Sequence, residues 1–381
     1  MTATGAPSPA RRARRSLVPV RTLPRTLSRT LSRKELTAAL AARQLLLERG
    51  RLAPAAAIRA LTPLQAQDPP AAFIALAARL EGFSREALEA AIEARTVVKT
   101  TVMRLTLHLV AGEDYPAYHR LAASARMRTW RKEYPHLDEK RVVAELGSWL
   151  RRPRTNSEIR ERVLAYDGVP ATEWGPIAFA RTLLPLVQLP PAGFWSDPRR
   201  PRFVLDPRPL PSEAEAAALV LERYLGAFGP ASPRDVASWS GVAQRDFAEA
   251  FERLETVSYR DEKGVELFDL PGSPLPPPST KLPVRLLARW DQALLAYADR
   301  DRIVPPELRP LRLTLSGDQT LTVDGRVAAS WKLERSRSVV KVAVTPHAAI
   351  PRRAHAHIRA EAERTARFCE PGAARVELAG L

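Results

Sequence analysis

The sequence is poor in the residues that build metal and redox centres. Cys369 is the single cysteine among 381 residues, which excludes an internal disulfide and a zinc site made of several thiolates. Two of the six histidines, His355 and His357, stand close together, but their segment has helical periodicity. A helix points side chains two residues apart in different directions. We therefore expect no metal and no other cofactor.

The chain also lacks long hydrophobic runs. No stretch approaches the roughly 18 consecutive apolar residues that a membrane-spanning helix needs. No apolar segment follows the basic N-terminus, which argues against a secretory signal, although mitochondrial presequences share its Arg- and Ser-rich, acid-poor composition. We expect a cytoplasmic protein without a membrane partner.

Acidic residues are scarce. Residues 1–33 contain eight arginines and no Asp or Glu, and residues 34–381 still carry 51 basic against 42 acidic side chains. A chain this basic is expected to bind a polyanion, and the lack of a basic amphipathic helix favours double-stranded DNA over an anionic membrane. A high-GC codon bias, which raises the content of Arg and Ala, is an alternative source of the excess charge.

Proline and glycine residues divide the chain into repeated units. After an Arg-rich extension that we expect to be disordered, three helices followed by a short hairpin occur three times, as in winged helix-turn-helix modules. The predicted divisions are the extension, 1–33; winged-helix modules over 34–135, 136–211 and 212–271; a Pro-rich linker, 272–283; and a β-rich domain with a terminal helix, 284–381. This organisation places the chain in the α+β class.

The third unit shows the pattern most clearly. The segments "SEAEAAALVLERYLGAFG" and "SPRDVASWSG" predict two helices, the second beginning at a proline and ending at Gly241. The segment "AQRDFAEAFERLETV" is the candidate recognition helix, and "SYRDEKGVELFDL" is the hairpin wing. We expect Arg234, Gln244 and Arg245 to contact DNA phosphates, and Trp239 to lie in the core.

The hairpin of the first unit carries an alternating polar pattern. Arg104, Thr106 and His108 alternate with apolar residues in "MRLTLHL", so on a strand they would share one face. That face would contact DNA at a phosphate or at a damaged base. The alternative is an ordinary wing that faces solvent.

The segment "LTPLQAQDPP", residues 61–70, combines two amides with a carboxylate. Periodicity predicts a helix over residues 54–67, which places Gln65 and Gln67 at its C-terminal end. By themselves they would be an ordinary polar helix end. Asp68 would cap the helix end or form a salt bridge, and the alternative is a part in catalysis.

Five segments, in this order along the chain, resemble the winged-helix DNA glycosylase family (AlkZ-like). They are "LTPLQAQDPP", "VMRLTLHLV", "YLGAFGPASPRDVASWSG", "RWDQALLAYADRDRIVP" and "LTVDGRVAASWKLE". The resemblance covers about residues 34–370 and implies tandem winged helices, a C-terminal β-barrel-like domain, and excision of N7-alkylated purines, in some members from interstrand crosslinks. It also implies that Gln65 and Gln67 are catalytic, since Gln65-Ala66-Gln67 matches the family's Gln-apolar-Gln signature.

The chemistry of a double amide suits such a substrate. Hydrolysis of a glycosidic bond needs a held water, stabilisation of an oxocarbenium-like centre and departure of the leaving group. A glutamine can hold water through its carbonyl oxygen, but it takes no proton at neutral pH. A purine alkylated at N7 already carries positive charge and leaves without a general acid. The double amide would therefore favour damaged over undamaged purines.

Two functions are compatible with the sequence. The first is a monofunctional DNA glycosylase, associated with the nucleoid, that acts as a monomer because three modules in one chain can wrap DNA. The second is a non-catalytic winged-helix DNA-binding protein or transcription regulator. Glutamines open to a basic channel would favour the first function, and glutamines packed in a helical core would favour the second.

Overall fold

The structure is a computed structural model that describes residues 29–381 with gaps at 167–168, 170 and 337–338, so most of the Arg-rich extension lies outside the described residues. The first unit begins with β1 (Thr30–Leu31), α1 (Arg33–Arg43), α2 (Pro54–Leu61), β2 (Leu64–Gln65), α3 (Pro69–Ala77) and α4 (Arg85–Glu93). It continues with β3 (Val97–Thr101), the 3-10 turn η1 (Met103–Leu105), β4 (Leu107–Ala111) and the long helix α5 (Tyr115–Glu133).

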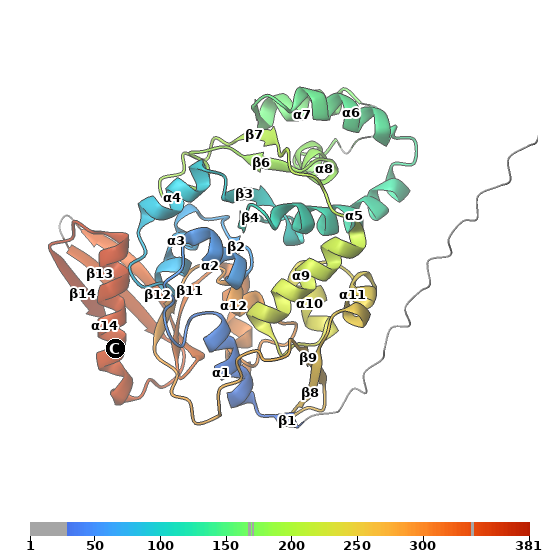
Figure 1. The fold of residues 1–381 in the computed structure, drawn as a ribbon. Helices are drawn as coiled ribbons and strands as arrows, with labels where there is room; N and C mark the ends of the chain where they lie inside the picture. The colour runs from blue at the N-terminus through green and yellow to red at the C-terminus, as the bar shows by residue number, and fades with distance from the viewer. Residues whose placement is uncertain (1–28, 167–168, 170, 337–338) are drawn as a thin grey trace, which may run out of the picture.

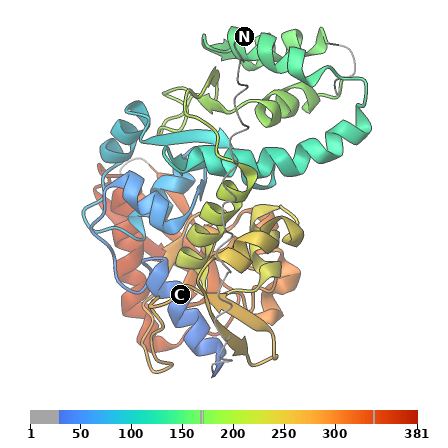
Figure 2. The same cartoon turned by 45° about the vertical axis from the view of Figure 1, so that its right-hand side comes forward.

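The second unit forms a lobe that stands apart from the rest of the chain, with α5 leading up to it (Figures 1 and 2). Its elements are α6 (Glu139–Trp149), β5 (Arg154–Thr155), α7 (Asn156–Leu164), α8 (Gly175–Leu183), β6 (Leu186–Gln188) and β7 (Arg202–Leu205). The three helices followed by the paired strands β6 and β7 agree with the order expected from the sequence, whereas β5 was not predicted.

The third unit packs beside the lower end of α5 (Figure 1). It consists of α9 (Glu213–Phe228), α10 (Pro233–Ser240), the 3-10 turn η2 (Gln244–Phe247), α11 (Ala248–Arg253), β8 (Val257–Asp261) and β9 (Glu266–Asp269). The predicted recognition helix is thus split into η2 and the short α11. Trp239 is 1% exposed, and its ring lies 5.0 Å from that of Tyr224, which confirms its place in the core.

The C-terminal part is an open sheet covered by a helix. Its elements are β10 (Arg285–Leu287), α12 (Gln292–Leu295), η3 (Pro306–Leu311), α13 (Leu313–Ser316), β11 (Gln319–Val323), β12 (Arg326–Ser336), β13 (Val339–Pro346), α14 (Arg352–Cys369) and β14 (Arg375–Ala379). Asp324 and Gly325 form the hairpin turn between β11 and β12, and Gly317 ends α13.

The expectation of a barrel-like domain is wrong for the described chain. The strands pair in the order β10-β11-β12-β13-β14, so the two edge strands do not meet and the sheet stays open. Helix α14 packs against the sheet through an apolar stripe that includes Ile358, Ala362 and Ala366, and thereby buries the face that a closed barrel would turn inward. The result is a mixed fold of helices and three sheets.

A six-stranded sheet joins the first two units. Its order is β2-β4-β3-β6-β7-β5, and the β3–β6 pairing aligns Lys99 with Gln188 and Thr100 with Val187. The strands on the two sides of the predicted boundary at residues 135/136 therefore belong to one sheet. At the other end of the chain, Thr30 pairs with Arg260 of β8, so the last residues of the predicted disordered extension are ordered as β1.

Several helices begin where the sequence supplies caps. Thr155, Ser212 and Ser232 each accept a hydrogen bond from the backbone three residues on, and the acidic residue there bonds back, which forms a capping box. Helix α10 also begins with Pro233 and ends at Gly241, whose φ of 75° is the left-handed conformation that glycine adopts without strain. None of the helices in the described ranges combines the length and hydropathy needed to cross a membrane.

Candidate functional site

Gln65 lies on a short strand and Gln67 in the bend that follows it, not on the helix that the sequence predicted. Helix α2 ends at Leu61, and Thr62 has a φ of 71°. Pro63 follows, and a proline disfavours the helical conformation in the residue before it. The chain then forms β2, in which Gln65 stands opposite His108 of β4 at the edge of the six-stranded sheet.

The alternation of a strand accounts for the Gln-apolar-Gln pattern. Ala66 is 2% exposed and packs in a cluster with Phe73 and Leu109, and its N–H donates to the Leu107 carbonyl at 2.9 Å. Gln65 is half-buried and Gln67 is exposed. Since successive side chains of a strand point to opposite faces, the apolar residue anchors the segment and leaves both amides on the other face.

Both glutamine side chains are held by hydrogen bonds to the start of β4. The Leu107 N–H donates to Gln67 Oε1 at 3.3 Å, which fixes the carbonyl side of that amide. Thr106 Oγ1 lies 3.2 Å from Gln65 Oε1 and 3.2 Å from the Met103 carbonyl oxygen. A hydroxyl has one proton and a carbonyl oxygen has two lone pairs. Each amide therefore keeps an acceptor site for a water molecule.

Asp68 follows the pair at the start of α3. Its side chain makes no capping bond to that helix, and its Oδ1 lies 3.4 Å from Arg199 Nη2. The salt bridge, one of the two structural roles expected from the sequence, is confirmed, and the capping role is not.

The predicted polar face of Arg104, Thr106 and His108 is wrong. Residues 103–105 form η1, not a strand, and both Arg104 (φ 50°) and Leu105 (φ 55°) have left-handed backbones. The break reverses the alternation, so Leu105 is 41% exposed while His108 is 2% exposed. His108 therefore has little surface to offer to DNA, whereas Arg104 and Thr106 are half-buried.

His108 serves the geometry of this turn. Its Nδ1 lies 2.9 Å from the Thr106 carbonyl oxygen, so Nδ1–H is the donor of this bond. Burial, together with the nearby charge of Arg104, lowers the pKa of His108 to about 3. The imidazole is therefore neutral at physiological pH and fixes the backbone of the residue that contacts Gln65.

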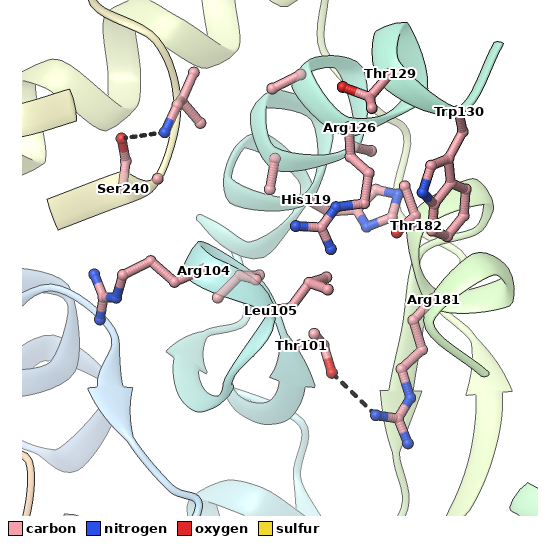
Figure 3. Close-up of a pocket in the computed structure, with 16 residues that line it drawn as sticks. Thr101, Arg104, Leu105, His119, Arg126, Thr129, Trp130, Arg181, Thr182 and Ser240 are labelled. Carbon is pink, nitrogen blue, oxygen red and sulfur yellow. Dashed lines mark hydrogen bonds between the residues drawn. The ribbon is translucent and has the colours of Figure 1, made fainter. Parts of the chain in front are cut away.

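A basic cavity of about 320 Å³ lies beside the turn. Arg104 and Leu105 of η1, Arg126 of α5 and Arg181 of α8 contribute to its lining, which contains no Asp or Glu (Figure 3). Burial lowers the pKa values of Arg104 and Arg181 to about 10, which leaves both charged at neutral pH. The sequence did not single out Arg126 or Arg181, because nothing in an Arg-rich chain marks which arginines lack a carboxylate partner.

The other predicted DNA contacts are spread over different surfaces. Arg234, Gln244 and Arg245 are all exposed. Arg234 lines a cavity rich in acidic residues near Asp261 and Asp299, while Arg245 lines another beside Asp246. The structure does not bring these three side chains together with the glutamines.

Comparison with known proteins places this geometry in a family. The model of the family described as "DNA glycosylase AlkZ-like" matches residues 58–368. The chain belongs to this family. The matched range includes Gln65, Gln67 and the three arginines of the cavity, and it ends within α14.

Two members of the AlkZ-like family illustrate the relationship. An "interstrand DNA cross-link repair glycosylase" from Streptomyces sahachiroi is 25% identical over 348 residues, which cover 78% of this chain and 87% of the relative. The solved structure of the Streptomyces sahachiroi DNA glycosylase AlkZ superposes with a TM-score of 0.75 at 22% identity, and the match covers 92% of this chain and 100% of that one. The structural likeness shows that the fold is shared.

Proposed function

We propose that this protein is a monofunctional DNA glycosylase that hydrolyses the N-glycosidic bond of N7-alkylated purines, with Gln65 and Gln67 as its catalytic residues. The observation that carries the proposal is the placement of the half-buried Gln65 at the end of an edge strand and of the exposed Gln67 just after it, in a member of the AlkZ-like family. Gln65 and Gln67 are not packed in a helical core, which supports the glycosylase over a plain DNA-binding protein, although neither residue lines the basic cavity beside η1.

The geometry suggests how the two amides divide the work. Gln67 is exposed and its carbonyl oxygen is held by the Leu107 N–H, so its second lone pair can hold a water against C1′. The Gln65 carbonyl oxygen can accept a hydrogen bond from the Thr106 hydroxyl, and its partial negative charge would stabilise the oxocarbenium-like centre. Neither amide accepts a proton at neutral pH, so the departing base must already be positively charged.

The proposed substrate is therefore a cationic base in double-stranded DNA. A duplex with one 7-methylguanine should release that base on incubation with the purified protein, while the same duplex with guanine should release none. A crosslinked duplex is the second substrate to test, since the name of the Streptomyces sahachiroi relative refers to crosslinks. If neither damaged duplex loses a base and the protein footprints one DNA sequence, the alternative of a non-catalytic regulator replaces this proposal.

The three helical units with their hairpins would act as winged-helix modules on the DNA. We infer that the protein works as a monomer at the nucleoid, because one chain already carries three such units. Arg104, Thr106, Arg234, Gln244 and Arg245 are proposed DNA contacts on the exposed or half-buried surface.

A further inference from the structure

Three arginines without a carboxylate partner gather on the lining of one cavity of the described chain. Elsewhere, some buried or half-buried arginines have carboxylate partners, as in the pairs Arg43–Asp269 and Arg223–Asp114, and others, such as Arg302, donate to backbone carbonyl oxygens. At the cavity, by contrast, Nη1 of Arg104, Nη1 of Arg126 and Nε of Arg181 are buried without a hydrogen-bond partner among the described residues. Buried donors and charges without partners are unfavourable, so such a cluster calls for an anion.

The arrangement of the arginines favours an extended anion over a single ion. Figure 3 shows Arg126 reaching from α5 toward Leu105, with Arg104 and Arg181 on opposite sides of the cavity. Arg181 is fixed by bonds from its guanidinium to Asn156 Oδ1 at 3.1 Å and Thr101 Oγ1 at 3.4 Å. A chain of phosphodiesters can meet such separated charges one after another.

The lining argues against a flipped base as the occupant. Recognition of a base uses hydrogen bonds to its polar edge together with stacking on apolar or aromatic side chains. Among the described residues the cavity lining has Trp130 and His119 but no Asn, Gln, Asp or Glu, so the donor groups of a base would find no side-chain amide or carboxylate there to accept them.

We propose that this cavity, between η1, α5 and α8, seats the phosphate backbone of one DNA strand through Arg104, Arg126 and Arg181. The identity of the polyanion rests on the proposed function. The seat adjoins the glutamines directly, because Arg104 and Leu105 line it and the next residue, Thr106, contacts Gln65. A strand held here would lie next to the turn that carries Thr106, the contact of Gln65.

The test measures binding of the full chain to an undamaged duplex at increasing salt. Arg126→Gln should weaken binding about five- to tenfold and reduce the slope of log affinity against log salt by about one, the change expected for one lost phosphate contact. Arg181→Gln should do the same, whereas Arg181→Lys should keep the slope. Arg131→Gln is the matched control, since Arg131 lies on the same helix but is already paired with Glu139.

A second arm localises the contact. Single methylphosphonates placed along the duplex should weaken binding of the wild type at one or a few positions, and at the position facing Arg126 they should have no further effect on Arg126→Gln. The proposed phosphate site would be contradicted if Arg126→Gln kept the wild-type DNA affinity and salt slope. It would also be contradicted if the effects of the methylphosphonate and of Arg126→Gln were additive at every position of the duplex. The proposal would also be contradicted if inorganic phosphate raised the melting temperature of the wild type but not of Arg126→Gln, while both proteins bound DNA equally well.

Folding and catalysis are controlled separately. Arg126 Nη1 has no partner to lose, so Arg126→Gln should melt at the wild-type temperature or above it without DNA. A fall in its melting temperature would assign Arg126 a structural role and contradict the seat. Base release is measured separately, because the binding assay uses undamaged DNA. If the wild type releases the base but Arg126→Gln binds DNA like the wild type, only the proposed phosphate site is contradicted. If the binding changes occur but the wild type releases no base, only the glycosylase proposal is contradicted.

Discussion

At the scale of single residues, Thr106 decides how Gln65 is presented. Its hydroxyl lies 3.2 Å from both Gln65 Oε1 and the Met103 carbonyl oxygen, so it is a positioning residue for the amide. Thr106→Val, which keeps the shape and removes the hydroxyl, should slow release of 7-methylguanine about tenfold, equivalent to roughly 1.4 kcal/mol. Thr106→Ser should restore the rate. Equal single-turnover rates for the Val and Ser variants would contradict this role.

Buried histidines make stability depend on pH. Burial lowers the pKa of His108 to about 3 and that of His119 to about 4, compared with about 6.5 in the unfolded chain. Below pH 6.5 these histidines are protonated in the unfolded chain but stay neutral in the folded chain. As the pH is lowered, the free energy of unfolding should therefore fall by about 1.4 kcal/mol per pH unit for each histidine. The loss should be absent above pH 6.5.

Urea unfolding between pH 7 and pH 5 tests this dependence. His108→Gln should show a shallower decline than the wild type, whatever its stability at pH 7. His357→Gln, which changes an exposed residue of α14, should keep the wild-type slope. Parallel curves for wild type and His108→Gln would show that His108 is not the titrating group.

The sequence could identify Gln65 and Gln67 but not their setting. The pattern of amide, apolar residue and amide could be recognised in the sequence. Helical periodicity nevertheless predicted a helix there, because periodicity alone takes no account of Pro63, two residues before Gln65. The sequence also did not predict the two left-handed residues of η1, because neither Arg104 nor Leu105 is a residue type that favours such a conformation. The unpaired arginines became visible only once their distant neighbours were known.

At the scale of elements, end signals were the reliable guide. Ser84, Thr155, Ser212 and Ser232 cap helices where the sequence indicates it, and Gly241 ends α10. By contrast, no element was predicted over α5, and the short strands β1, β2, β5 and β14 were missed. Such strands exist through pairing with partners far along the chain, which local periodicity does not record.

The cap of α10 offers a test at this scale. Ser232 Oγ accepts from the Asp235 N–H at 3.3 Å, and its own N–H donates to Asp235 Oδ2 at 2.9 Å. Ser232→Ala should lower the free energy of unfolding by about 1 kcal/mol, the usual loss for a removed N-cap. Ser238→Ala, at an exposed position of the same helix, should change it by less than about 0.5 kcal/mol. Similar losses for the two variants in urea denaturation would contradict the capping role.

At the scale of the whole molecule, buried ion pairs join distant parts of the chain. Arg79, just after α3, pairs with Asp291 at the start of α12, with Nη2 and Oδ1 2.7 Å apart and both side chains 0% exposed. Asp291→Asn would leave a buried guanidinium without its counter-charge and should destabilise the fold by about 3–5 kcal/mol. Asp299→Asn, in an exposed network with Lys263 and Arg309, should cost less than about 1 kcal/mol. Chemical denaturation of both variants compares the two directly, and a loss for Asp291→Asn no larger than that for Asp299→Asn would contradict the account.

The shared sheet holds the short strand β2 against β4, and residues of η1, just before β4, line the basic cavity. The most direct test of the central claim compares base release and DNA binding in the Gln65→Ala/Gln67→Ala double variant, with Gln319→Ala on the C-terminal sheet as control. Under single-turnover conditions on a 7-methylguanine duplex, the double variant should lose at least about a hundredfold in rate, roughly 2.7 kcal/mol, while its affinity for the duplex stays within about threefold. Release by the double variant at the wild-type rate would contradict the assignment of catalysis to the two glutamines.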